Sequence, residues 1–207
     1  QVTRWRVSPG WYLLAPLIPI LYGEADVLAY VVAGVPVELT DASPLSFLTN
    51  FLITLLVAGG IEEFGWRGFA QPRLQENHSA GLVAIGIGLV WVAWHLPFFM
   101  LFEYEVFELG GFHWYLLESV AFSVILAWLY NQTSGSLLIV MLCHGTHNLS
   151  GVIEPAAEPT GVTARLADVA PDIASVLTVV GLFVAFGHDR LTRSRLPPIV
   201  LGRPGGT

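Results

Sequence analysis

The chain has 207 residues, of which 54% are hydrophobic and only 12% are charged, and its mean hydropathy is +0.65. Charged residues make up about 25% of an ordinary soluble domain, so this composition predicts an integral membrane protein. The net charge of −7 argues against nucleic acid as a partner, and the single cysteine, Cys143, excludes an internal disulfide and a cysteine-cluster metal site.

Three segments open the chain. Residues 11–22 are apolar but short and contain two prolines, which predicts a kinked helix. Residues 23–41 carry acidic residues around an apolar centre too short to cross a bilayer, so we expect an interfacial or re-entrant segment. Residues 45–74 are predicted to form one long helix, with Ser43 as its N-cap and Pro44 at the first helical position.

Four further helices are expected after this one, at residues 80–102, 112–130, 136–149 and 173–186. The predicted fold is therefore an all-α, polytopic transmembrane helix bundle with about six to seven membrane segments. Because the sequence starts at Gln1 and not at methionine, we expect an N-terminal truncation that removes upstream helices.

The pattern indicates one domain. We expect a single transmembrane bundle over residues 1–190, with the motifs gathered in residues 45–150, and a disordered cytoplasmic tail over residues 191–207, which are polar and then rich in proline and glycine.

Basic and acidic residues alternate at the ends of the predicted helices. Every basic residue is arginine; arginines cluster at residues 4–6, 67–73 and 190–195, whereas the intervening helix ends are mainly acidic. The positive-inside rule then places the N-terminus, the loops at 71–79 and 131–135 and the C-terminus in the cytoplasm. A cell-membrane protein is expected, with membrane lipids around it.

Glu62 and Glu63 close the apolar part of the third segment, and Arg67 follows one turn later. A charge inside a bilayer costs roughly 2.5–3.5 kcal/mol on insertion scales, so such groups usually line a wet cavity or pair with one another. Glu63 and Arg67 have the i, i+4 spacing of an ion pair. The alternative is that the carboxylates only anchor the helix end among lipid headgroups.

Two later helices also carry polar side chains. His95 lies one turn after Trp91, and His144 and Asn148 share one face of the 136–149 helix. Each alone is explained as an internal hydrogen-bonding group. Together, a carboxylate pair, a histidine and a His/Asn pair on three helices supply the parts of a hydrolase that activates water.

These residues resemble the motifs of a known family. Glu-Glu-Phe-Gly-Trp-Arg at 62–67, Trp-Val-Ala-Trp-His at 91–95 and His-Gly-Thr-His-Asn at 144–148 match, in order and type, the EExxxR, aromatic-xxxH and HxxxN motifs of the CPBP intramembrane proteases. That family contains the CAAX-processing and bacteriocin-processing (Abi) membrane proteins. The resemblance covers residues 45–150, with one departure: Trp91 stands where the family often has Phe.

The resemblance implies roles for the motif residues. Glu62 would be the general base, His95 would hold and deprotonate the water with it, and His144 and Asn148 would donate hydrogen bonds to the oxyanion. Arg67 would pair with Glu63 and fix the helix face. The substrate would be a membrane-associated peptide or protein, and the sequence does not say whether it is prenylated.

The resemblance implies no cofactor, but two alternatives stay open. Glu62, His95 and His144 are chemically able to ligate zinc, although no HExxH motif is present. A non-catalytic binding, immunity or transporter-like protein would use the same polar cavity.

One spatial question follows from these predictions. With a rise of about 1.5 Å per residue, Glu62 falls on the inner half of its helix and His95 on the outer half of the next. Bringing them together requires strongly tilted helices, a first helix that extends beyond the membrane, or a bend at Pro97.

Overall fold

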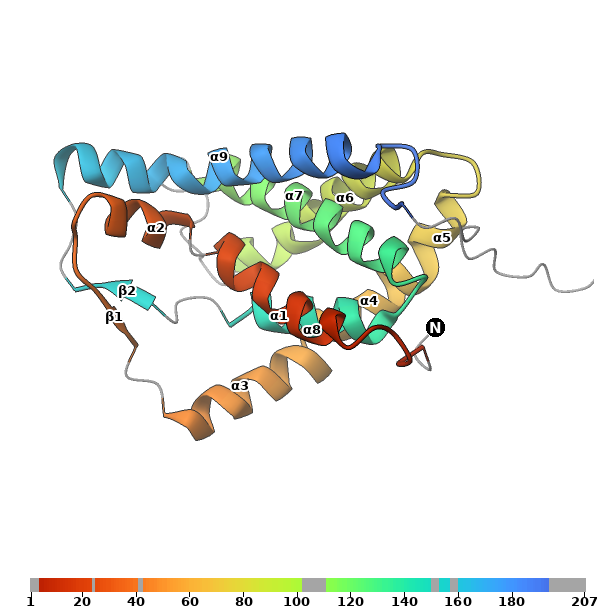
Figure 1. Ribbon diagram of the computed structural model, residues 1–207, viewed down its shortest axis with the longest axis horizontal. Coiled ribbons are helices and arrows are strands. Elements are labelled where there is room, and N and C mark those ends of the chain that lie inside the picture. Colours follow the sequence, from red (N-terminus) through yellow and green to blue (C-terminus); the bar gives the residue numbers. More distant parts are fainter. Residues whose placement is uncertain are drawn as a thin grey trace, which may run out of the picture.

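The structure is a computed structural model that describes residues 4–23, 25–40, 43–101, 111–149, 153–156 and 160–193 (Figure 1). This part of the chain is overwhelmingly helical, which confirms the predicted helix bundle. Its elements are α1 (Gly10–Gly23), α2 (Ala25–Val32), β1 (Val37–Leu39), α3 (Pro44–Leu56), α4 (Gly59–Gly65), the π-helical turn η1 (Trp66–Ala70), α5 (Gln71–Leu74), α6 (Ala80–Leu101), α7 (Gly111–Gln132), α8 (Leu137–His147), β2 (Ile153–Pro155) and α9 (Gly161–Phe186).

Within the described residues, 4 helical segments are long and apolar enough to cross a membrane: Pro44–Leu74, Ala80–Leu101, Phe112–Gln132 and Gly161–Phe186. The helices α1 and α8 are apolar but shorter. These segments make the chain an integral membrane protein, whereas the count of six to seven membrane segments stays a prediction.

The prediction of one unbroken helix over residues 45–74 is wrong. Although Ser43 caps α3 as expected, accepting a hydrogen bond from the Ser46 amide at 3.1 Å, this helix ends at Leu56. Ala58 has non-helical angles, φ −98° and ψ −134°, and α4 starts after it. Two glycines permit the break, because a Cβ on Gly60 would lie 2.2 Å from the Leu55 carbonyl oxygen. As a result α3 points away from the rest of the bundle (Figure 1).

Helix α7 is central to the packing, since α6, α8 and α9 all contact it. The core consists mainly of α7 and α8 side chains, and several of them are completely buried, among them Leu126, Leu129 and Ile139. In contrast, large apolar side chains on α3 and α9 face outward, as expected for surfaces that meet lipid tails.

Other boundaries differ from prediction at polar positions. The final helix was expected from residue 173, but α9 already begins at Gly161 and contains Pro171. The first half of α9 carries charged residues, so its sequence does not have the apolar pattern of a membrane helix. One of these residues, Asp172, is paired with His113 at 3.2 Å. The segment predicted to be interfacial or re-entrant contains the short α2, and β1 forms an unpredicted antiparallel pair with β2. Most of the predicted tail lies outside the described residues.

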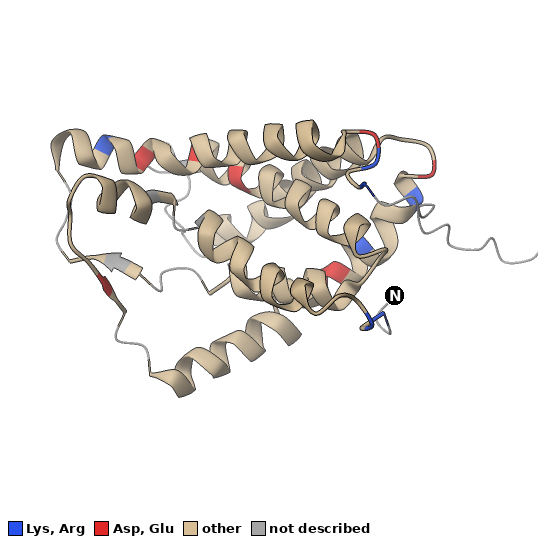
Figure 2. Ribbon diagram, in the orientation of Figure 1, with Lys and Arg blue, Asp and Glu red and all other residues tan. Residues whose placement is uncertain are grey.

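Arginines gather at the end of the bundle that holds the N-terminal segment, α5 and the end of α9 (Figure 2). The Arg4 side chain bonds the carbonyl of Ser134, and the Arg190 carbonyl accepts a hydrogen bond from Asn131, so both arginines lie beside the α7–α8 turn. Arg165 lies in the first turns of α9, whereas Arg190 follows the end of that helix. The described structure thus has one arginine-rich end, the end that the sequence pattern assigns to the cytoplasm.

Candidate active site

The three motifs meet at the buried indole of Trp91. Its Nε1 donates a hydrogen bond to Glu62 Oε2 at 2.8 Å. The ring centroid lies 4.9 Å from the His144 ring and 5.4 Å from the guanidinium carbon of Arg67. Residues from α4, η1, α6 and α8 therefore surround one aromatic side chain. The sequence predicted a packing role for Trp91 and missed its hydrogen bond to Glu62.

Beside Trp91 lies a fully buried charge cluster centred on Glu63. Its Oε1 accepts from Arg67 Nη1 at 3.1 Å and lies 2.7 Å from His144 Nδ1. Arg67 Nη2 donates to the hydroxyl of Ser123 at 2.9 Å and to its carbonyl at 3.2 Å. The predicted Glu63–Arg67 pair is thus present. The pair is only partly satisfied, because Glu63 Oε2 and Arg67 Nε are buried with no hydrogen-bond partner among the described residues.

His95 is linked to the same tryptophan through the backbone. Its Nδ1 lies 2.9 Å from the Trp91 carbonyl oxygen. A carbonyl can only accept, so Nδ1 carries the hydrogen, and in the neutral ring Nε2 is left with a lone pair. Nε2 is then free to take a proton.

Glu62 and His95 share one contact residue, Trp91. Glu62 and His95 both contact Trp91, one through its indole and the other through its carbonyl. The ring centroids of Trp91 and His95 are 6.0 Å apart. The break before α4 separates the direction of this helix from that of α3, so the position of Glu62 no longer follows from counting residues along one straight helix.

His144 and Asn148 face the backbone of Gly59. A Cβ at Gly59 would lie 2.3 Å from Asn148 Nδ2 and 2.5 Å from His144 Nε2. Both nitrogens therefore point to the start of α4, three residues before Glu62. His144 is buried, whereas Asn148 is the C-cap of α8 and is exposed. The structure brings the predicted His/Asn pair together on this side.

A zinc site requires at least three ligand side chains around one ion. Among the described residues, no group of three or more His, Cys, Asp and Glu side chains is arranged to hold a metal ion. The partners of Glu62 Oε2 and His144 Nδ1 leave the other Glu62 oxygen and the Nε2 atoms of both histidines as possible ligands, and a zinc-ligating histidine commonly bonds a carboxylate through its second nitrogen. Zinc therefore stays the alternative cofactor, which chelation tests.

A second carboxylate–imidazole pair escaped sequence reasoning. His147 Nε2 lies 2.9 Å from Glu118 Oε1, and the His147 ring stacks on Phe122 at 3.9 Å between centroids. Phe122 in turn stacks on Trp91 at 6.2 Å. Only the position of His147 next to Asn148 could have signalled this pair, because Glu118 stands alone in its helix. No sequence signal distinguished Ser123, the hydrogen-bond partner of Arg67, from the other serines.

The fold and this site define an integral membrane helix bundle with a carboxylate–imidazole cluster enclosed between its helices. A family model described as "Type II CAAX prenyl endopeptidase Rce1-like" matches residues 44–150, and the chain belongs to this family. The match confirms the resemblance to the CAAX-processing proteases.

One curated relative agrees with the family. The chain is 28% identical over 160 residues to a protein named CAAX prenyl protease 2 from Methanococcus maripaludis, and the alignment covers 72% of this chain. It spans only 57% of the relative's length. No solved structure matches the chain.

Proposed function

We propose that this protein is an intramembrane endopeptidase that hydrolyses a peptide bond near the membrane with water activated by Glu62 and His95. The observation that carries the proposal is the convergence of the three motifs on Trp91, which holds the Glu62 carboxylate 2.8 Å from its indole nitrogen. Family membership supports the same reaction class.

Glu62 and His95 are suited to act on one water molecule. One Glu62 oxygen is held by Trp91, and the other accepts no hydrogen bond from any residue that the structure describes. A neutral His95 offers the lone pair of its Nε2 as a second hydrogen-bond acceptor for the water. Glu62 takes one proton as the water oxygen bonds to the peptide carbonyl carbon. That proton then passes to the amide nitrogen as the C–N bond breaks, which leaves a carboxylic acid and an amine.

His144 and Asn148 would stabilise the negative oxygen of the tetrahedral intermediate. The Asn148 amide is a donor in any state, but His144 is not. Its Nδ1 faces Glu63, so its Nε2 bears a hydrogen only when the Glu63–His144 pair holds one additional proton. A preorganised oxyanion donor lowers the barrier by about 2.7–4 kcal/mol.

The first substrates to test are prenylated peptides that end in a CAAX sequence, because the relative is named a CAAX prenyl protease. We propose that the site works from the cytoplasmic side of the cell membrane, where the charge pattern places the arginine-rich end. Unprenylated membrane peptides, such as bacteriocin leaders, form the comparison set.

The test is cleavage by the purified chain in lipid nanodiscs. Glu62→Gln and His95→Ala should each abolish it, whereas Glu76→Gln, which makes the same change in the α5–α6 turn, should not. Activity that survives a chelator supports water activation by Glu62 and His95. Activity that is lost on chelation and restored by zinc would replace this mechanism with the metalloprotease. If the wild type cuts no peptide in either set, the proposed activity is wrong, and ligand binding or flux through the bundle becomes the measurement of choice.

A further inference from the structure

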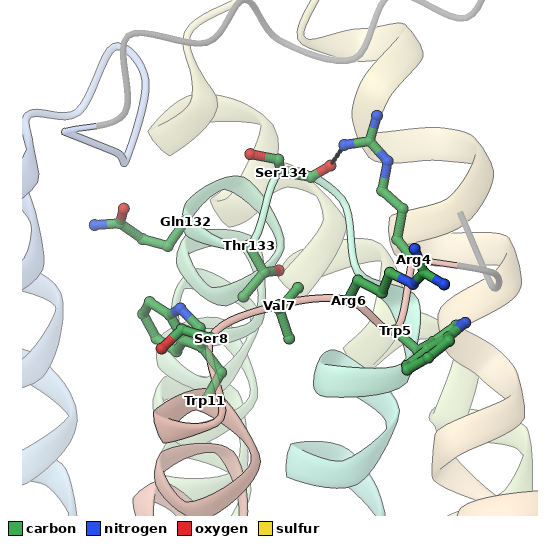
Figure 3. A pocket seen from close by; sticks show the side chains of 9 residues that line it. All are labelled: Arg4, Trp5, Arg6, Val7, Ser8, Trp11, Gln132, Thr133 and Ser134. Atoms are coloured by element: carbon green, nitrogen blue, oxygen red, sulfur yellow. Dashed lines mark hydrogen bonds between the residues drawn. The ribbon is translucent and has the colours of Figure 1, made fainter.

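A separate pocket lies at the arginine-rich end, between the N-terminal segment and the end of α7 (Figure 3). Its volume is about 670 Å³. The pocket is enclosed on one side by the chain leading into α1 and on the other by the turn into α8. The side chains that line it are basic, aromatic, apolar or hydrogen-bonding: Arg4, Trp5, Arg6, Val7, Ser8, Trp11, Gln132, Thr133 and Ser134.

The charge of this pocket has one sign. Arg4 and Arg6 both contribute to its wall, and none of the described residues that line it is acidic. Arg4 uses Nη1 to bond the carbonyl of Ser134, and the Arg6 guanidinium carbon lies 5.1 Å from the Trp5 ring centroid. Each contact fixes a guanidinium in place. Both side chains remain exposed, so further N–H donors are available to a ligand.

The pocket also has hydroxyl donors beside the start of α1. Ser8 lines it just before the helix, and Ser134 lines it on the opposite side. The Trp11 and Tyr12 amides already donate to the carbonyls of Ser8 and Pro9, so they are not counted as donors to a ligand. Two guanidinium groups and these hydroxyls match the chemistry of a phosphate group.

Aromatic side chains cluster beside the pocket. Trp11 packs edge-on against Trp128 with centroids 5.7 Å apart, and Trp128 lies 5.4 Å from Phe186. Trp5 is 56% exposed. Tryptophans in membrane proteins concentrate where the hydrocarbon meets the headgroups. A phosphate group at that level is the headgroup of a phospholipid.

We propose that this pocket binds the phosphate of an anionic phospholipid. It is distinct from the candidate active site. Ser136, just before α8, donates to the carbonyl of Arg4, whereas His144 lies eight residues further along, about 12 Å at a helical rise. The headgroup would tie the N-terminal segment to the α7–α8 turn and hold this end of the bundle at the membrane surface.

The test measures lipid retained by the full chain, using native mass spectrometry after reconstitution in equal amounts of phosphatidylglycerol and phosphatidylcholine. We expect one phosphatidylglycerol bound in preference to phosphatidylcholine. The Arg4→Gln/Arg6→Gln variant should bind it roughly 30-fold more weakly, since each arginine near an anionic lipid contributes about fivefold. The matched control, Arg73→Gln/Arg193→Gln, removes the same charge from the same end but outside the pocket, and should retain the lipid.

A second variant separates the pocket from general attraction to a charged surface. Ser8→Trp keeps both arginines but fills the space, and it should also lose the bound lipid. Added inorganic phosphate identifies the source of the ligand: displacement at millimolar concentration assigns the site to a free phosphate compound, and no displacement assigns it to the lipid. Equal retention of the two lipids, or equal loss in the control and pocket variants, would overturn the proposal.

Discussion

His144 Nδ1 lies 2.7 Å from Glu63 Oε1, and this contact joins the first motif of the chain to the last. It also fixes which nitrogen of His144 bears the shared hydrogen. The contact therefore makes Glu63 a determinant of what His144 can offer to a substrate, in addition to its ion pair with Arg67.

Glu63→Gln should lower kcat. The neutral amide leaves the buried Arg67 without its counter-ion and weakens the contact that holds the His144 ring. Cleavage kinetics at one fixed pH measure the change, and an unchanged kcat would contradict the role of Glu63.

Replacing Arg67 by methionine should strongly destabilise the bundle. The substitution leaves Glu63 buried and unbalanced, and removes two hydrogen bonds to Ser123. Loss of one member of a buried ion pair costs about 3–5 kcal/mol. Thermal unfolding in detergent measures the change. Arg73→Met is the control, because Arg73 is exposed and its contacts with described residues are to the Phe69 carbonyl and ring. An equal loss in both variants would show that the buried pair is unimportant.

Gly59→Ala should impair both cleavage and stability. The added methyl group would meet Asn148 Nδ2 at 2.3 Å and His144 Nε2 at 2.5 Å; the exposed Asn148 is able to rotate away, but the buried His144 ring is held by Glu63. Displacing the proposed oxyanion donors should lower kcat at least tenfold, and the strain at His144 should also lower the melting temperature. Gly65→Ala, in the same helix, meets nothing within 4 Å and should stay active. Full activity of Gly59→Ala would argue against this geometry.

Trp91→Phe tests the indole hydrogen bond separately from the ring. Phenylalanine keeps the aromatic packing but removes the donor to Glu62. A hydrogen bond to a charged group contributes about 1.5–3 kcal/mol, and Glu62 is partly exposed, so we expect about a tenfold fall in kcat/KM. Trp94→Phe on the same helix is the control, since Trp94 is 66% exposed. Identical kinetics for both variants would assign Trp91 to packing alone.

Local signals in the sequence predicted much of this structure. The Ser43 cap, the ends of α6 and the Glu63–Arg67 pair all follow from short-range rules, because capping and i, i+4 contacts depend on neighbours in the chain. The motif residues were also identified, and the structure brings them to one place.

The remaining features depend on contacts between distant segments. The break before Gly59 lies where Gly59 contacts the end of α8 and Gly60 contacts the Leu55 backbone. Glycines in a sequence do not by themselves predict a break in a helix. The first part of α9 is polar for a membrane helix. Its polar side chains bond to other helices: Asp172 pairs with His113, and Ser175 is hydrogen-bonded to Tyr22. The strand pairing of Val37 with Pro155 spans too much sequence for a local rule.

Two side chains of the η1–α5 segment, Arg67 and Gln71, bond to α7 one turn apart. Arg67 bonds Ser123, and four residues on, Gln71 bonds Asn131 and the carbonyl of Ala127. Sliding α4 by one residue, about 1.5 Å, would strand a buried guanidinium and a buried amide at once. Contacts within the protein, and not the surrounding lipid, therefore fix the position of Glu62 along the membrane normal. In bilayers of different thickness the lipid would adapt around the protein, and the Glu62 carboxylate would keep its position relative to Trp91.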